Sequence, residues 1–283
     1  MVSSTISLSC PLDGESLKYN TNHYLCPNGH SFDIARQGYV NLLPVQHKRS
    51  KQPGDSKAMV LARKQFLDEG IYRPVAEKLV ETINLYSVTN DVTSILDAGC
   101  GEGYYLDFLY RQNSSENEYA CLGLDISKEA IIEAAKRNKD IAWVVGTNRN
   151  PPVLEKSIDI IFSIFGFHSF EGFAKAIKNK GNLIVVEPNK DHLRELRNVI
   201  YEEDKEVNSF NESLATQQGF KLLENIPLQF KTKALNQKLI ANLLLMTPHF
   251  FRANKEGLLI AQQLNDICLT VDMTFRIFEF NSQ

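Results

Sequence analysis

The sequence lacks any apolar run long enough to cross a bilayer, which takes about 20 residues. The best candidate, residues 158–167, is short and contains Asp159. The N-terminal residues have neither a basic start nor an apolar core, so we expect no secretory signal. Cysteine is scarce, and five residues at irregular spacing argue against a disulfide framework and for a reducing compartment. We therefore expect a cytoplasmic protein with no membrane partner.

Glycine and proline are not abundant either. The 283 residues include 15 Gly and 10 Pro, with 43% hydrophobic and 23% charged residues, which excludes collagen-like, fibrous and wholly disordered chains. The net charge of −3 hides a basic strip, residues 46–64, which carries +5 against −8 for the rest of the chain. Such a strip favours a phosphate-bearing partner, or it is a solvated linker, and charge alone leaves both open.

Three zones follow one another along the chain: an N-terminal module at 1–45, a basic linker with helices at 46–90 and a larger domain at 91–283. In the second zone, Ser56 is expected to cap a helix over 57–68. Pro74 is expected in the first turn of a helix that runs to Leu85.

The third zone alternates short apolar runs with helical patterns. The expected strands are 94–97, 120–125, 141–145, 158–164 and 182–186, with helices from 104, over 128–138 and between the last two strands, and an antiparallel strand over 269–280. Strands separated by helices form a parallel sheet that is covered on both faces. The sequence therefore predicts an α/β fold, a doubly wound, Rossmann-like sheet with a small N-terminal module.

A glycine-rich turn lies between the first expected strand and the next helix. Its glycines, Gly99, Gly101 and Gly103, let the backbone approach a ligand closely and adopt positive φ angles. Their spacing differs from the G-x-G-x-x-G that seats a dinucleotide pyrophosphate. The carboxylate of Asp97 would repel a phosphate and suits a cationic ligand with an amino acid end.

Two further groups lie at the ends of the next strands. Asp125 ends the second strand, where a carboxylate can bind both hydroxyls of a ribose, and Thr147 and Asn148 follow the third, where they can recognise an adenine edge. Together these groups describe S-adenosylmethionine. The pattern resembles the class I methyltransferases, whose first motif is E/D-x-G-x-G-x-G. The alternative is a glycine turn that serves only tight packing.

Motifs outside this domain narrow the resemblance. They occur in a set order along nearly the whole chain: Cys10-Pro-Leu, Cys26-Pro-x-x-His30, residues 38–50, residues 53–56, Ala62-Arg63, residues 66–68, residues 99–105 and Met246-Thr-Pro248. The sequence resembles the bacterial 23S ribosomal RNA guanine-N1 methyltransferases. That resemblance implies an N-terminal zinc module, a 23S rRNA hairpin as substrate, S-adenosylmethionine as cofactor and a homodimer.

The zinc module of this family has the pattern Cys-x2-Cys followed by Cys-x3-His. This chain has Cys10, Cys26 and His30 in place, whereas Asp13 stands where the second cysteine belongs. A carboxylate oxygen is an acceptable zinc ligand, although it weakens a soft-ligand site. We expect bound zinc with Asp13 as the fourth ligand. The alternatives are His23 as that ligand, or loss of the metal.

The resemblance also implies contacts with S-adenosylmethionine. The full set is Tyr72, Asp97, Gly99, Cys100, Gly101, Glu102, Gly103, Asp125, Thr147, Asn148 and His192. In the family Tyr72 aligns with a tyrosine that closes over the methionine end, and His192 with a histidine that borders the same pocket. For both, the alternative is a surface or packing role. We expect Cys100 to be a small residue against the cofactor and not a nucleophile, because no base is evident beside it.

The resemblance places RNA on the N-terminal module and the basic strip. Lys48, Arg49 and Lys51 would contact phosphates, and the target guanine must be unstacked or flipped. Guanine N1 bears a proton at neutral pH, so a general base would help the transfer. His168 and Glu171 are the available candidates, because class I enzymes commonly place substrate-facing residues after the fourth strand.

These features predict an enzyme that transfers a methyl group from S-adenosylmethionine to N1 of a guanine in a 23S rRNA hairpin. One alternative is a small-molecule methyltransferase, because the fold does not set the substrate. The basic strip and the N-terminal module argue against it. Another alternative is a non-catalytic rRNA-binding assembly factor that keeps the cofactor pocket, which the change at Asp13 leaves open.

Overall fold

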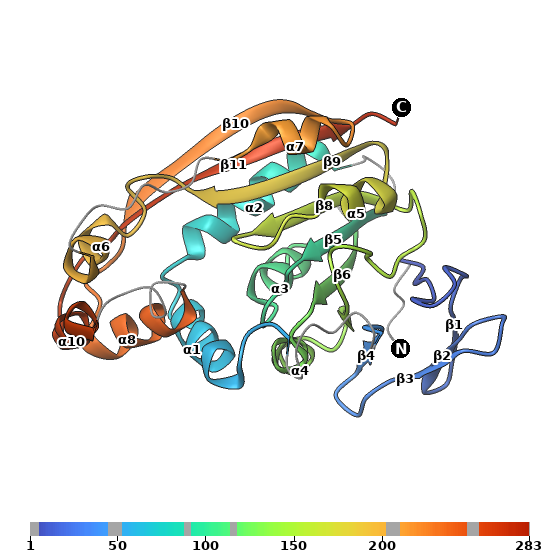
Figure 1. Ribbon diagram of the computed structural model, residues 1–283, viewed down its shortest axis with the longest axis horizontal. Coiled ribbons are helices and arrows are strands. Elements are labelled where there is room, and N and C mark those ends of the chain that lie inside the picture. The colour runs from blue at the N-terminus through green and yellow to red at the C-terminus, as the bar shows by residue number, and fades with distance from the viewer. Residues whose placement is uncertain are drawn as a thin grey trace.

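The computed structural model describes residues 6–44, 53–87, 92–113, 118–201, 210–247 and 255–282. Its central feature is a sheet made of β4 (Tyr39–Asn41), β5 (Thr93–Ala98), β6 (Tyr119–Asp125), β7 (Ala142–Val145), β8 (Ile158–Ile164), β9 (Ile177–Pro188), β10 (Phe220–Lys231) and β11 (Thr270–Phe280). The strand order in space is β10-β11-β9-β8-β5-β6-β7-β4 (Figure 1). The doubly wound α/β fold predicted from the sequence is confirmed.

The direction of the strands sets the position of the ligand crevice. β5 pairs in parallel with both β6 and β8, and only β11 runs antiparallel to its neighbours β9 and β10 among the described strands of this sheet. From β5 the chain builds outward to β6 and β7, and then returns to the other side of β5 as β8. In open α/β sheets, ligands bind outside the carboxyl ends of the strands at such a reversal.

Helices connect these strands, and those that begin before residue 177 agree closely with the sequence predictions. They are α1 (Lys57–Asp68), α2 (Arg73–Tyr86), α3 (Tyr104–Tyr110), α4 (Lys128–Arg137), α5 (Phe170–Ala176), α6 (Arg194–Ile200), α7 (Glu212–Thr216), α8 (Gln237–Met246) and α10 (Lys255–Gln263). α1 has the predicted bounds, and the Ser56 side chain caps it by accepting from the Met59 N–H at 3.4 Å. Pro74 lies in the first turn of α2, as predicted.

Both faces of the sheet are buried. Ile95 and Phe162 belong to one hydrophobic cluster, which includes Leu79 of α2. Their neighbours along the strands, such as Leu96, belong to a second cluster with Phe173 of α5. Successive strand residues point to opposite faces, so these two clusters are the two layers that a parallel sheet with helices on both sides requires.

The N-terminal residues form a small sheet of β1 (Lys18–Asn20), β2 (His23–Leu25) and β3 (Ser31–Asp33). The next strand, β4, does not continue this sheet. It pairs in parallel with β7 of the central sheet, with Tyr39 opposite Trp143. The N-terminal module is therefore joined to the larger domain by an edge strand.

Several elements of the C-terminal half are absent from the sequence predictions. β10 pairs with β11 along its whole length, and α6, α8 and α10 gather with α1 at the end of the molecule opposite β1–β3 (Figure 1). The predicted strand over 269–280 is confirmed as β11. This helical end places α8 against α1, beside the glycine turn.

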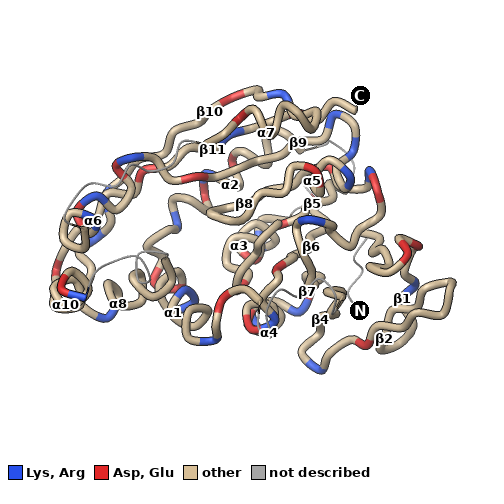
Figure 2. The backbone as a smooth tube through the Cα atoms, viewed as in Figure 1, with Lys and Arg blue, Asp and Glu red and all other residues tan. Residues whose placement is uncertain are grey.

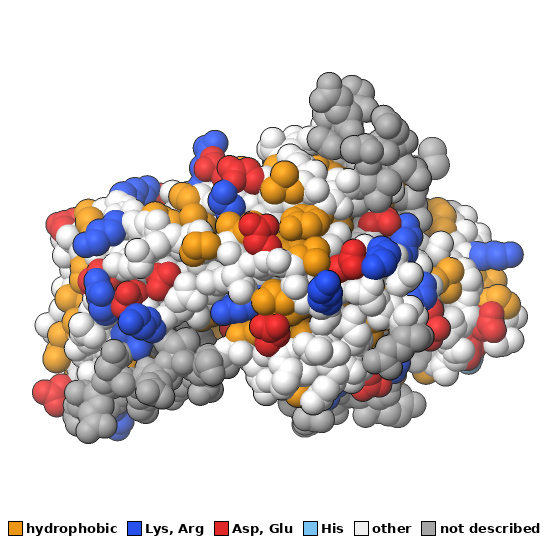
Figure 3. Space-filling view, turned by 90° about the horizontal axis from the view of Figure 1, so that it is seen from above, with side chains coloured by type: hydrophobic (Ala, Val, Ile, Leu, Met, Phe, Trp, Pro, Cys, Tyr) orange, Lys and Arg blue, Asp and Glu red, His pale blue; other side chains and the backbone are white. Residues whose placement is uncertain are grey.

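Acidic and basic side chains are interspersed over the described chain (Figure 2). The face seen in Figure 3 has no broad basic field among its described residues, since red and blue side chains alternate there with orange ones. Among the described helices, none combines the length and the apolar character that a membrane span requires.

Candidate functional site

The glycine turn, residues 99–103, follows β5 at the point where the strand order reverses. Gly99 and Gly103 have φ angles of +98° and +83°, which side chains other than glycine rarely adopt. A Cβ on Gly103 would lie 2.6 Å from the Trp143 ring, so close packing also requires this glycine. A Cβ on Gly99 would meet only Gly166 at 3.8 Å and Asn148 at 3.9 Å, which leaves room for a ligand against the backbone.

Asp97 is a buried carboxylate without a partner on one oxygen. Its side chain is on β5 directly before the turn, the residue is 3% exposed, and Oδ2 has no hydrogen-bond partner among the described residues. Burial, followed by the nearby charges of Asp125 and Glu102, raises the pKa of Asp97 well above its usual value. An isolated buried carboxylate is costly, and a cationic ligand group relieves that cost. This orphaned oxygen fits the amino group of an amino acid ligand.

Asp125 ends β6 and joins that strand to the glycine turn. Its Oδ2 accepts from the Gly101 N–H at 2.9 Å, and its Oδ1 accepts from the Ser127 N–H at 2.8 Å. Burial raises the pKa of Asp125, and these backbone donors oppose the shift. Each carboxylate oxygen keeps a second lone pair, so the group can still accept from a ribose diol.

Glu102 and Cys100, two residues of the turn that were predicted to contact the cofactor, are both buried among protein groups. Glu102 is 1% exposed and forms a two-bond ion pair with Arg137, whose Nε donates to Oε2 at 2.8 Å. Cys100 is buried, and burial raises the pKa of its thiol well above the usual value. A protonated thiol is a poor nucleophile, which agrees with the expectation that Cys100 is only a small residue of the turn.

Arg63 lies over the glycine turn, a position that the sequence did not reveal. Its Nη1 donates to Oδ2 of Asp55 at 2.5 Å, and its Nη2 donates to the Met246 carbonyl at 3.1 Å. A Cβ on Gly101 would lie 3.7 Å from Nη1 of Arg63. The sequence showed Arg63 only as one charge of the basic strip and as part of a family motif. In the structure its guanidinium faces a site otherwise rich in carboxylates.

The segment before α1 packs against the end of β6. Ser127 Oγ donates to the Asp55 carbonyl at 2.8 Å, and a Cβ on Gly54 would lie 2.8 Å from Cβ of Ser127. Gly54 also has a φ angle of +81°. The segment 53–56 therefore covers the carboxyl end of β6 beside Asp125.

Tyr72 and His192 lie together, as their shared assignment to one pocket predicts. The Tyr72 hydroxyl is 3.4 Å from Nε2 of His192, and Tyr72 is buried, which raises its pKa. The Asp272 N–H donates to Nδ1 of His192 at 3.3 Å, so the ring proton of a neutral His192 is on Nε2. Phe165 joins them, with ring centroids 6.4 Å from Tyr72 and 5.6 Å from His192.

The loop after β7 contacts the loop after β8. Asn148 Nδ2 donates to the Phe167 carbonyl at 2.9 Å, and Thr147 Oγ1 accepts from the Arg149 N–H at 3.3 Å. The Asn148 amide thus ties together two loops at the carboxyl edge of the sheet. Adenine recognition by Thr147 and Asn148 stays a prediction.

The two candidate bases have different surroundings. His168 is mostly buried, with 11% of its side chain exposed and Nε2 3.3 Å from Oε1 of Glu187. Burial together with the charge of Arg276 lowers its pKa to about 4. It is therefore neutral at pH 7. Glu171 is in the first turn of α5, where it is exposed and pairs with Lys175 at 2.9 Å, which lowers its pKa.

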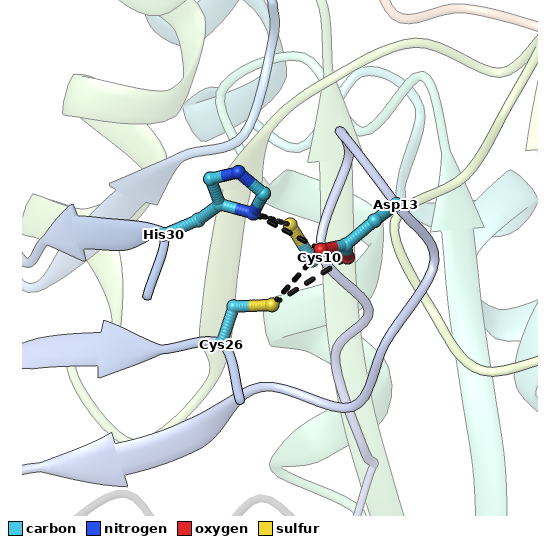
Figure 4. Close-up of side chains that lie close together, drawn as sticks. All are labelled: Cys10, Asp13, Cys26 and His30. Atoms are coloured by element: carbon cyan, nitrogen blue, oxygen red, sulfur yellow. Dashed lines mark hydrogen bonds and ion pairs between the residues drawn. The ribbon is translucent and has the colours of Figure 1, made fainter. Parts of the chain in front are cut away.

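The four predicted metal ligands converge in the N-terminal module (Figure 4). Their ligand atoms lie within 4.8 Å of one another, and Asp13 Oδ2 is 3.1 Å from His30 Nδ1 and 3.2 Å from Cys26 Sγ. Cys10 Sγ is 3.4 Å from the same His30 nitrogen. Sulfur, imidazole and carboxylate donors in one cluster fit a zinc ion.

His23 is not part of this cluster. Its ring nitrogens lie 3.1 Å from Asn22 Oδ1 and 3.5 Å from Asn20 Nδ2, in the strand β2. The structure therefore favours Asp13 over His23 as the fourth ligand. Asn28 Nδ2 donates to Asp13 Oδ2 at 3.0 Å, which orients that carboxylate toward the cluster.

The expected phosphate contacts Lys48, Arg49 and Lys51 lie outside the described residues. The cofactor residues are all described, and most of them lie at or directly after the carboxyl ends of β5, β6 and β7. Sequence reasoning missed Arg63, Phe165 and Phe167 at this edge. Exposed aromatic residues directly after the fourth strand are the signal that could have indicated the last two.

Comparison with known proteins matches both parts of the chain. Residues 8–51 match a zinc-ribbon family model described as "RlmA, N-terminal", and residues 95–180 match one described as "Methyltransferase domain". A Bacillus subtilis protein named as a 23S rRNA (guanine-N(1)-)-methyltransferase is 30% identical over 95% of both chains.

Two actinobacterial proteins match a shorter part of the chain. The 23S rRNA (guanine(748)-N(1))-methyltransferase of Streptomyces fradiae is 31% identical over 67% of this chain and 66% of its own. A protein of Micromonospora griseorubida named as a 23S rRNA (guanine-N(1)-)-methyltransferase is 32% identical over 67% of this chain and 68% of its own.

Proposed function

Since the chain belongs to the family of 23S rRNA (guanine-N1)-methyltransferases, we propose that it methylates N1 of a guanine in a hairpin of 23S rRNA, in the cytoplasm. The observation that carries the proposal is the presence of two sites in one chain. These are the converging ligand set of the N-terminal module and the orphaned Asp97 oxygen beside the glycine turn. The first is typical of the rRNA family, and the second suits the methyl donor.

The residues of the crevice fit S-adenosylmethionine. When bound, this cofactor supplies the methyl group as an electrophilic sulfonium. Asp97 would accept from the amino group, and Asp125 would accept from the ribose hydroxyls. Gly99 leaves the backbone open to the ligand, with a Cβ meeting only Gly166 and Asn148. Arg63 would pair with the α-carboxylate, because its guanidinium lies beside Gly101, whereas Arg137 at the same turn is already paired with Glu102.

The acceptor reaction forms an N1–CH3 bond and releases the N1 proton, while the carbon–sulfur bond of the donor breaks and S-adenosylhomocysteine leaves. His192 is unsuited as the base, since its Nδ1 already accepts from the Asp272 N–H and its Nε2 carries the ring proton. Its Nε2–H can instead donate to Tyr72 or to a guanine carbonyl oxygen. Of the two predicted bases, His168 is neutral at pH 7 but its pKa of about 4 makes it a weak proton acceptor, and Glu171 is held by Lys175.

The N-terminal module would hold zinc through Cys10, Asp13, Cys26 and His30. The metal would fix the turns that carry these ligands, and so the shape that the module presents to RNA. Contacts of Lys48, Arg49 and Lys51 with RNA phosphates, and a homodimeric state, remain part of this proposal.

The test is methyl transfer to RNA. Purified protein is incubated with tritiated S-adenosylmethionine and protein-free 23S rRNA from a strain that lacks this enzyme. Primer extension then locates the product, because N1-methylguanine blocks Watson–Crick pairing and stops the polymerase. One new stop in a hairpin loop is the expected result. No label in RNA despite cofactor binding would favour a non-catalytic factor, and turnover on a metabolite alone would favour a small-molecule enzyme.

A further inference from the structure

Two phenylalanines are exposed on the loop that follows β8. Phe165 is 41% exposed and Phe167 is 58% exposed, although this loop borders an otherwise well-packed sheet. The loop lies at the carboxyl edge of β8, across from the glycine turn, since Gly166 is the residue that a Cβ on Gly99 would meet. Both rings are therefore on loops that border the cofactor crevice.

Phe165 is held in a conformation that a bulky residue rarely adopts. Its φ angle is +53°, in the left-handed region. The Phe165 N–H donates to the Val186 carbonyl at 3.0 Å, which keeps the loop against the end of β9. The ring contacts Tyr72 and His192 and still keeps a large exposed area. Strain of this kind is typical of functional sites, where the position of a side chain matters.

Phe167 forms a cation–π contact with Arg149. The Arg149 guanidinium lies 4.9 Å from the ring centroid, and no carboxylate among the described residues pairs with Arg149. The bond from Asn148 Nδ2 to the Phe167 carbonyl fixes the two loops relative to each other. An exposed aromatic ring with an unpaired guanidinium presents both a stacking surface and a positive charge.

This combination matches the chemistry of single-stranded RNA. Bases stack on aromatic rings and on guanidinium planes, and the arginine charge attracts the phosphate that follows. A guanine that is methylated on N1 must leave its stack, and it then needs a new surface against which to bind. Phe165 offers such a surface, on the loop whose Gly166 faces Gly99 of the turn that would hold the methyl donor.

We propose that Phe165 stacks on the flipped target guanine, and that Phe167 with Arg149 binds an adjacent nucleotide of the RNA strand. The inference rests on the proposed function and adds the residues that receive the acceptor. Phe165 contacts the reacting base, so its ring acts on the methyl-transfer step. Phe167 and Arg149 act on RNA affinity.

The test compares three alanine variants with two matched controls. Phe165→Ala, Phe167→Ala and Arg149→Ala are measured beside Leu223→Ala, at 43% exposure, and Leu85→Ala, at 75% exposure. The readouts are the Kd for S-adenosylmethionine by calorimetry, and kcat and KM with protein-free 23S rRNA. Phe165→Trp tests rescue by another ring, and Phe165→Gly removes the ring together with the left-handed strain.

We expect Phe165→Ala to lower kcat roughly tenfold or more, the scale of one lost base–aromatic stack, with an unchanged cofactor Kd. Phe167→Ala and Arg149→Ala should raise KM for RNA by roughly tenfold each with little change in kcat. Phe165→Gly should lose activity to the same extent as Phe165→Ala yet melt no lower than the wild type, a result that a merely structural ring would not give. Phe165→Trp and both controls should retain activity.

Three outcomes overturn the inference. A weaker cofactor Kd in Phe165→Ala would make the ring a cofactor contact. Full activity of Phe165→Ala, or RNA kinetics of Phe167→Ala and Arg149→Ala equal to those of the controls, would show that these rings do not bind RNA. If the wild type itself transfers no methyl group to 23S rRNA, the proposed function fails, and the inference falls with it.

Discussion

Oδ2 of Asp13 lies 3.1 Å from Nδ1 of His30, within the cluster of the four predicted zinc ligands. A carboxylate here is a harder and weaker zinc ligand than a cysteine. We therefore predict that Asp13→Cys tightens zinc binding and that Asp13→Ala loosens it. The loss should be at least the roughly 10- to 100-fold that accompanies removal of a supporting partner.

Competition with a chromophoric chelator measures both affinities. Asn28→Ala is a useful second variant, because Asn28 is not itself a ligand. Its Nδ2 donates to Oδ2 of Asp13 at 3.0 Å and so orients that carboxylate. His23→Ala is the control and should leave the affinity unchanged. If Asp13→Ala and the wild type bind zinc with equal affinity, Asp13 is not a zinc ligand.

Removing the buried charge of Asp97 should stabilise the fold near pH 7 and at the same time weaken cofactor binding. Its pKa is raised in the folded protein, so its ionised form destabilises the fold as pH rises above the usual carboxyl range. Asp97→Asn should therefore melt at a higher temperature than the wild type near pH 7, with the difference shrinking below about pH 4. Cofactor affinity should fall by about 1.5–3 kcal/mol, the value of a charged hydrogen bond.

Calorimetric unfolding scans at both pH values, with a binding titration at pH 7, measure the two effects. Asp159→Asn provides a contrast, because the pKa of Asp159 is lowered by its hydrogen bonds and it stabilises the fold when ionised. An Asp97→Asn protein that is less stable at pH 7 and binds the cofactor normally would contradict the assignment.

Arg63 should recognise the carboxylate of the cofactor and not its nucleoside. Arg63→Ala should weaken binding of S-adenosylhomocysteine by about 1.5–3 kcal/mol, since a charge-assisted contact is lost. Binding of 5′-methylthioadenosine, which lacks the amino acid end, should change little. The affinity of Arg63→Lys for S-adenosylhomocysteine should lie between those of the wild type and Arg63→Ala, because lysine keeps the positive charge but lacks the planar guanidinium.

Isothermal titration with the two ligands gives this comparison directly. Arg111→Ala serves as the control, because Arg111 is an exposed arginine that pairs with Asp107 on α3. An equal loss for both ligands would mean that Arg63 only supports the turn through Asp55 and Met246.

His168 should make the protein sensitive to mild acid. Its pKa is about 4 in the folded protein, against a usual value near 6.5. Between pH 4 and pH 6.5 the unfolded chain therefore binds a proton at His168 that the folded protein does not bind. That difference corresponds to about 2 kcal/mol of lost stability by pH 5. His168→Leu should flatten the decline in melting temperature between pH 7.5 and pH 5.

The same variant tests the proposed base. If His168 accepts the N1 proton, His168→Leu should also lower kcat by roughly 100-fold or more, the usual contribution of a general base. A variant with full turnover and a flattened stability profile would keep the buried histidine as a packing residue and remove it from the chemistry.

Local signals explain what the sequence could predict. The bounds of α1 and the Ser56 cap depend on contacts within a few residues, and β8 is a mostly apolar run interrupted only by Asp159 and Ser163, so both were predicted with the right bounds. The glycine turn was predictable because Gly99 and Gly103 are required by backbone angles. The ligand set of the N-terminal module followed from family spacing.

Contacts between distant segments explain the rest. β10 contains Pro227 and several exposed charges, and it is a strand because β11 pairs with it along its length. Arg63 reaches the Met246 carbonyl 183 residues away, so its place over the turn depends on how α1 packs on α8. The position of Phe165 depends on a hydrogen bond between its N–H and the carbonyl of Val186, which lies 21 residues further along the chain. Periodicity carries no information on any of these.

The central claim is that this chain methylates N1 of a guanine in 23S rRNA. The most direct measurement is mass spectrometry of nucleosides from protein-free 23S rRNA and 16S rRNA, each treated with the enzyme and S-adenosylmethionine. We expect a gain of one 1-methylguanosine per 23S molecule and none in 16S rRNA. A methyl group on another nucleoside, or equal methylation of both RNAs, would contradict it.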